Sequence, residues 1–234
     1  MPYYFPFDMY YLILVLPAVL LALFAQIRVQ RSFRKYAQVR TRRALTGAQA
    51  AQAILQANDL THIRIEPVAG RLSDHYDPKA GVIRLSEAVY GADSVAAVGV
   101  AAHEAGHAVQ YGNGYGPIRL RQAIIPVSRV GSMLAMPLVL LGLFLSYGWL
   151  IQLGILFFGL AVVFQLVTLP VEFNASRRAL AALEERRLLD ETELPQARRV
   201  LSAAALTYVA ALAVSLAQFL RLLLLFGGQR GRRR

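Results

Sequence analysis

The chain contains no cysteine among its 234 residues. This absence excludes disulfide bonds, cysteine nucleophiles and thiolate ligands for a metal ion. We therefore expect any metal in this protein to be held by histidine nitrogens and carboxylate oxygens. Both kinds of ligand are scarce, because the chain has only 4 His and 14 Asp and Glu residues.

Acidic residues are outnumbered by 25 Lys and Arg, which gives a net charge of +11. Seven of these basic residues fall between positions 28 and 43, where there is no acidic residue, and four more occupy the last five positions. They flank apolar segments and are not interleaved with aromatic residues that would stack on bases. This pattern is typical of cytoplasmic flanks of membrane helices, so we expect no nucleic-acid partner.

Hydrophobic residues make up 56% of the chain, more than is usual for a soluble enzyme. Apolar runs at 9–27, 130–147 and 149–171 are each long enough to cross a bilayer. Positive charge follows the first run, whereas a cleaved signal peptide carries it in front, so we expect an anchor. With the basic segment 28–43 inside, the N-terminus lies outside and the next region is cytoplasmic. The second and third runs then form a hairpin that returns to the cytoplasmic side.

A fourth apolar run, at 200–220, leaves two interpretations open. A full crossing places Arg230 and Arg232–Arg234 outside, against the usual distribution of positive charge. Alternatively, the alanine-rich part, 203–213, packs against the catalytic domain. We expect a full or nearly full span, and hence three to four transmembrane helices.

Residues 46–116 have the character of a small soluble domain, with charges and turns in place of long apolar runs. Segments 62–66 and 81–85 alternate as strands do, and a turn at 77–80 precedes the second. They predict a short antiparallel sheet.

Helix signals flank these strands. Thr46 is suited to cap a helix at 47–57, and Asp93 or Ser94 to cap a longer one at 95–111. The predicted fold class is therefore mainly α, with multi-pass transmembrane helices and a small zincin-like α+β catalytic domain.

The longer helix carries the pattern H-E-x-x-H at His103, Glu104 and His107. Residues i and i+4 lie on one face of a helix, so both imidazoles can reach one metal ion. Glu104 is then left to take a proton from water. The alternative is a packed helix whose two histidines make only local hydrogen bonds.

A catalytic zinc ion usually has three protein ligands and one open position. His62 and His75 are candidates for the third ligand, but we favour Glu172, which lies where the predicted hairpin returns to the cytoplasmic side. Glu172 would begin a new helical stretch, so its alternative role is to interact with that helix dipole. His75 could instead polarise a substrate carbonyl, and Tyr208 could donate to an oxyanion; ordinary hydrogen bonding and packing are the simpler roles.

Four stretches together resemble a known family, the YugP-type neutral zinc metallopeptidases. They are residues 74–78, 82–86, 103–110 and 170–180. The resemblance extends from near residue 30 to beyond residue 210. It implies a bacterial multi-pass membrane metallopeptidase of the gluzincin group, similar to the heat-shock membrane proteases and the prenyl-protein endopeptidases.

The resemblance also implies roles for individual residues. Glu172 corresponds to the glutamate that opens an E-x-x-A-D motif as the third zinc ligand, with Ala175 in its matching place. Ser176 departs from the aspartate of that motif, so Ser176 or Asn174 would hold a ligating histidine ring. The predicted strand at 82–85 would offer a free edge to an extended peptide. That strand contains Val82, Ile83, Arg84 and Leu85.

These observations predict a zinc-dependent endopeptidase in the bacterial cytoplasmic membrane, with its catalytic domain on the cytoplasmic side. Its expected partners are a protein or peptide substrate and the lipid bilayer; the oligomeric state stays open. Two alternatives are a non-catalytic membrane adaptor that keeps a metal or peptide cleft, and a metal hydrolase acting on a non-peptide bond.

The predicted segments are an anchor (1–28), a catalytic domain (29–126), a hairpin (127–171), a charged helical segment (172–199) and a C-terminal helix with a basic tail (200–234).

Overall fold

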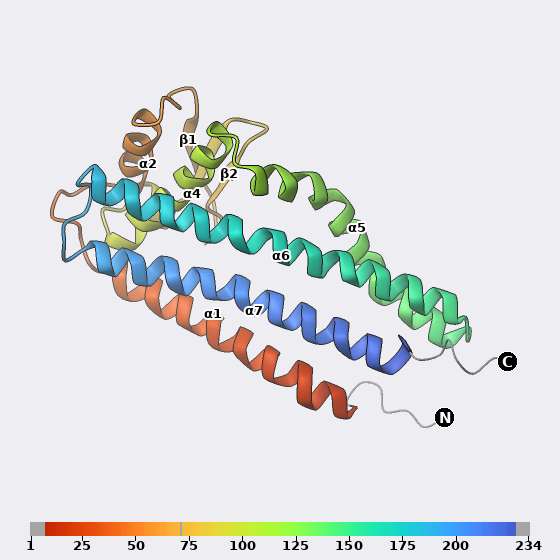
Figure 1. Cartoon of the computed structure of the whole chain (residues 1–234). Coiled ribbons are helices and arrows are strands. Elements are labelled where there is room, and N and C mark those ends of the chain that lie inside the picture. Colours follow the sequence, from red (N-terminus) through yellow and green to blue (C-terminus); the bar gives the residue numbers. More distant parts are fainter. Residues whose placement is uncertain (1–7, 71, 228–234) are drawn as a thin grey trace. The chain divides into compact units, whose positions relative to one another are not determined.

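The computed structural model describes residues 8–70 and 72–227, which form a mainly helical chain with one small sheet (Figure 1). The predicted fold class is confirmed. The elements, in order, are a π-helical turn (Tyr11–Val15), α1 (Leu16–Tyr36), α2 (Gly47–Gln56), β1 (Arg64–Val68), β2 (His75–Asp77), β3 (Val82–Ser86), α3 (Glu87–Tyr90), α4 (Val95–Gly112), α5 (Gly116–Phe144), α6 (Gly148–Glu185) and α7 (Leu194–Phe226).

The chain divides into two compact units. Within the described residues, the first unit comprises 8–25, 120–169 and 207–227. The second comprises 26–119, apart from residue 71, together with 170–206. Each unit is therefore assembled from segments that are distant in the sequence.

Four helices in the described part of the chain are long and apolar enough to cross a membrane. They are α1 with its preceding π-helical turn, α5, α6 and α7. The ambiguous run at 200–220 lies inside α7, which continues without interruption from Leu194 to Phe226. The basic tail that raised the conflict, Arg230 and Arg232–Arg234, lies outside the described residues.

An ion pair in the first unit joins Asp8, just before the first helix, to Arg221 of α7. The Arg221 guanidinium donates to Asp8 Oδ2 from Nη2 at 2.6 Å and from Nε at 2.9 Å, and Arg221 is only 3% exposed. The same guanidinium lies 5.3 Å from the centre of the Tyr11 ring. The start of the first helix and the end of α7 are thus held together.

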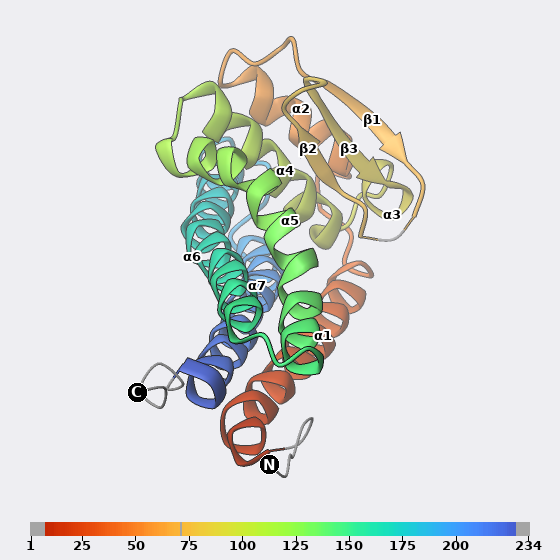
Figure 2. The same cartoon turned by 90° about the vertical axis from the view of Figure 1, so that its right-hand side faces the viewer.

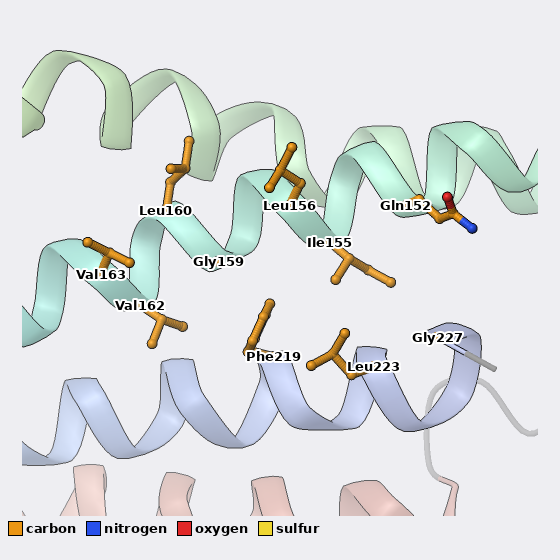
Figure 3. A pocket seen from close by; sticks show the side chains of 10 residues that line it. All are labelled: Gln152, Ile155, Leu156, Gly159, Leu160, Val162, Val163, Phe219, Leu223 and Gly227. Atoms are coloured by element: carbon orange, nitrogen blue, oxygen red, sulfur yellow. The ribbon is translucent and has the colours of Figure 1, made fainter. Parts of the chain in front are cut away.

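The first unit also carries an apolar groove of about 590 Å³ along α6 and α7. In Figure 3, Phe219 and Leu223 of α7 face Ile155 and Val162 of α6. Gly159 lies opposite Phe219, where a Cβ would come within 3.3 Å of the ring. The absence of a side chain at this position leaves room for the phenyl ring.

In the second unit, α4 is the central helix. It is buried on nearly all sides, which is typical of a helix in the core of a domain. Ser94 caps it by accepting from the Ala97 N–H, as the sequence predicted. Thr46 likewise caps α2 and forms a capping box with Gln49. The core between these helices includes Ile54, Leu55, Val98, Ala101 and Ala105.

The sheet is mixed, so the predicted antiparallel pairing of its two longer strands was wrong. β3 pairs in parallel with β1 and antiparallel with β2 (Figure 2). The turn after Asp77 joins β2 to β3, so β3 is paired across this turn with β2 and not with β1. Asp77 Oδ1 accepts from the Lys79 and Ala80 N–H groups in this turn. The three residues of β2 were too few to give an alternating pattern in the sequence.

The strand order, β1-β3-β2, also contradicts the predicted free edge. Val82, Ile83, Arg84 and Leu85 belong to the central strand. The Arg84 guanidinium ties that strand to both neighbours, at 3.1 Å from Asp77 Oδ2 and 3.8 Å from Glu66 Oε2. The Ala80 N–H and this guanidinium hold the pKa of Asp77 below its ordinary value. These four residues therefore stabilise the sheet and do not provide an open strand edge.

Candidate metal centre

Helix α4 places His103 and His107 on one face, with their ring centres 4.7 Å apart. Glu172 of α6 reaches both rings with a single carboxylate oxygen. Its Oε2 lies 3.2 Å from His103 Nε2 and 3.6 Å from His107 Nε2. The ligand atoms of the three residues all lie within 4.8 Å of one another.

The two separations that involve Glu172 fit a zinc ion. Ligand bonds of about 2.0–2.2 Å in tetrahedral geometry put neighbouring donor atoms about 3.3–3.6 Å apart. The two measured nitrogen-to-oxygen distances, 3.2 and 3.6 Å, agree with that spacing. The donor set of two imidazoles and one carboxylate is also one that catalytic zinc sites use.

The cluster is largely shielded from solvent, since Glu172 is 2% exposed and His107 is 8% exposed. Burial alone would lower the pKa of the His107 imidazole. The hydrogen bond with Glu172 and the negative charges of Glu104 and Glu172 outweigh burial, so the pKa of His107 lies above its ordinary value of 6.5. A cation at this position is therefore stabilised by its surroundings.

Glu172 lies in the middle of α6, which corrects the expectation that it begins a new helical stretch. The helix continues through Pro170 from Gly148 to Glu185. Glu172 is therefore too far from a helix N-terminus for the alternative role, an interaction with the helix dipole, to explain it. Beyond Pro170, the stripe of Val171, Ala175, Ala179 and Leu183 is fully buried and fixes which face of α6 turns inward.

Gly106 allows α4 and α6 to approach closely at this point. A Cβ added to Gly106 would lie 2.6 Å from the Ala175 carbonyl oxygen. No side chain fits there unless one helix moves, and such a movement would displace Glu172 relative to the two histidines. One of the variable positions of the H-E-x-x-H pattern is therefore constrained in this protein.

Each histidine ring also has a partner at its other nitrogen. Ser176 Oγ lies 3.1 Å from His103 Nδ1, and Gln110 Oε1 lies 3.0 Å from His107 Nδ1. Such partners fix the orientation of metal-binding imidazoles. The serine thus occupies the position at which the resemblance implied a histidine-holding group.

Glu104 follows His103 directly and is 8% exposed. Its negative charge contributes to the raised pKa of His107, so its carboxylate is close to the cluster. It is not one of the three residues whose ligand atoms converge. Glu104 therefore lies beside the candidate metal centre without belonging to its ligand set.

The remaining candidates do not belong to the three-residue cluster. His75, in β2, is exposed and donates from Nδ1 to the Ser73 carbonyl at 2.7 Å, so it is not part of the cluster. Asn174 lies one helical turn before Arg178 and accepts a hydrogen bond from it. Tyr208 lies in α7, in the first unit, and its role as an oxyanion donor stays a prediction.

Sequence reasoning assigned no role to Gln110 or Gly106. Gln110 could have been identified by its position, three residues after His107 on the same helical face and among apolar neighbours. The constraint on Gly106 depends on the backbone of a helix nearly 70 residues away, which no local pattern reveals.

The His–His–Glu cluster on an H-E-x-x-H helix, together with four long apolar helices, is typical of membrane zinc metallopeptidases. The chain belongs to the family described as "Putative neutral zinc metallopeptidase", which matches residues 11–227. It is 46% identical over 218 residues to a protein of Bacillus subtilis (strain 168) described as "Putative membrane protease YugP". That similarity covers 93% of this chain and 97% of the relative. No solved structure matches the chain.

Proposed function

We propose that the protein is a membrane-embedded, zinc-dependent endopeptidase. The observation that carries this proposal is the convergence of His103 Nε2, His107 Nε2 and a Glu172 carboxylate oxygen at zinc-like separations. Membership of a zinc metallopeptidase family and the relative's description as a membrane protease support it. The expected substrates are proteins or peptides, and the expected surroundings of the four long helices are lipid.

In the proposed reaction, His103, His107 and Glu172 would hold the ion. Zinc supplies a Lewis acid, which polarises a carbonyl group and lowers the pKa of a water molecule. Glu104 accepts the proton of the attacking water and then passes it to the leaving amine. Water adds to the carbonyl carbon, the C–N bond breaks, and the products are a carboxylate and an amine.

Removing zinc provides the test of this proposal. We expect the detergent-purified protein to bind one zinc ion per chain and to cleave an unfolded protein such as casein. A chelator should abolish cleavage, and stoichiometric zinc should restore it. Elemental analysis and gel electrophoresis measure the two effects. A protein that retains no zinc, or that cleaves equally well without it, would contradict the proposal.

We also propose that the second unit faces the bacterial cytoplasm, because the basic segment 28–43 belongs to it. The absence of native cysteine makes single-cysteine labelling straightforward. Suitable positions are Arg40, whose side chain is 83% exposed, and Ser146 in the exposed loop between α5 and α6. In intact cells, an impermeant maleimide should label Ser146→Cys, and it should label Arg40→Cys only after permeabilisation. The opposite pattern would place the catalytic unit outside.

A further inference from the structure

The side chain of Gln110 is fully buried, and its carboxamide bridges α4 and α6. Its Oε1 lies 3.0 Å from His107 Nδ1. Its Nε2 donates to the Val171 carbonyl at 2.8 Å and to Asn174 Oδ1 at 2.9 Å. One buried amide therefore contacts a residue of the histidine pair and two residues of α6, one before and one after Glu172 in the sequence.

Two groups of α6 set the direction of these hydrogen bonds: the Val171 carbonyl, which can only accept, and Asn174, whose orientation Arg178 fixes. Arg178 Nε donates to Asn174 Oδ1 at 2.8 Å, and a guanidinium has no acceptor. Asn174 must therefore present its oxygen and not its amide nitrogen. The Asn174 oxygen and the Val171 carbonyl both accept, so the Gln110 amide nitrogen, which donates, must face them. The Gln110 oxygen is then left to face His107.

This orientation determines the tautomer of His107. Because Gln110 Oε1 can only accept, the proton of the neutral imidazole must be on Nδ1. The lone pair is then on Nε2, the atom 3.6 Å from Glu172 Oε2. His103 differs, because its partner Ser176 carries a hydroxyl, which can donate or accept and does not impose one tautomer.

We infer that Gln110 is a positioning residue that holds His107 with Nε2 deprotonated and directed at the metal, and that Arg178, through Asn174, reinforces the polarity that the Val171 carbonyl requires. The inference rests on the proposed zinc centre. Gln110 touches neither the reacting atoms nor the ion. Groups of this kind typically change metal affinity by about 10- to 100-fold when they are removed.

Two substitutions at residue 110 separate positioning from packing. Gln110→Met keeps the side-chain length in an apolar form but loses the acceptor for His107. Gln110→Glu keeps an acceptor, at the cost of facing the oxygens of Val171 and Asn174. A positioning role predicts that zinc affinity falls about 10- to 100-fold in the methionine variant and less in the glutamate variant. A packing role predicts the reverse, because a buried carboxylate beside two carbonyl oxygens disturbs the fold more.

The measurements are zinc affinity, by competition with a chromophoric chelator, and the thermal unfolding midpoint of each metal-free protein. Both use the full-length protein in detergent. Arg178→Met, at a partly exposed side chain, should lower zinc affinity several-fold by letting Asn174 turn over, and it serves as the test if neither variant at residue 110 folds. A folded Gln110→Met protein with wild-type zinc affinity would overturn the inference, as would unchanged affinity in Arg178→Met. Absence of zinc binding by the wild type would instead refute the proposed function itself.

Discussion

Replacing Glu104 by Gln should lower the rate of peptide cleavage by about 10²- to 10⁴-fold, the usual contribution of a general base. The amide matches the carboxylate in size but cannot accept the water proton. Glu104 is not one of the three converging residues, so the variant should still bind one zinc ion per chain. Cleavage of casein at saturating zinc, followed together with metal content, measures both effects.

The matched control for this substitution is Glu87→Gln. It makes the same chemical change at an exposed position in the first turn of α3. We expect this variant to retain wild-type cleavage and zinc content. If Glu104→Gln retained full cleavage, Glu104 would not be the base. If the wild-type protein cleaved nothing and Glu104→Gln bound peptide equally well, the non-catalytic adaptor would be the better description.

The sequence alone predicted the parts of the protein that depend on local patterns. The four apolar helices follow from the length of their runs, and the caps at Thr46 and Ser94 follow from side chains that accept hydrogen bonds from the next turn. The spacing of His103 and His107 predicted that both would lie on one helical face, and they do. These features need no information about distant residues.

Features that depend on distant backbone were predicted poorly. The parallel pairing of β1 with β3 depends on β2, which takes the antiparallel place next to β3. α6 continues through Pro170, although a proline inside a helix removes one backbone hydrogen bond and often ends the helix, so the local sequence did not predict this continuity. The hydrogen bonds of Gln110 likewise form only because α6 brings Val171 and Asn174 to it. Glu172 was favoured because the predicted hairpin returns it to the side of His103 and His107, and the family resemblance implied the same ligand.

The second large effect is expected at Glu172. Replacing it by Gln removes the negative charge but keeps the size of the side chain, at a position that is 2% exposed. Zinc would retain two imidazoles and at best a weak amide oxygen. If each of four ligands contributes about a quarter of a binding free energy of about 10–16 kcal/mol, the loss is about 2.5–4 kcal/mol. Zinc affinity should therefore fall by about two to three orders of magnitude.

Chelator competition measures this affinity, and Glu184→Gln is the matched control, because it makes the same change at an exposed position on the same helix. The control should bind zinc as the wild type does. Excess zinc should restore part of the cleavage activity of Glu172→Gln but none of that lost in Glu104→Gln, since only the former retains its base. This difference in rescue separates a ligand from a base within one assay. Wild-type zinc affinity in Glu172→Gln would show that another group completes the site, and the geometry of the cluster would then reflect only the attraction between a buried carboxylate and two imidazoles.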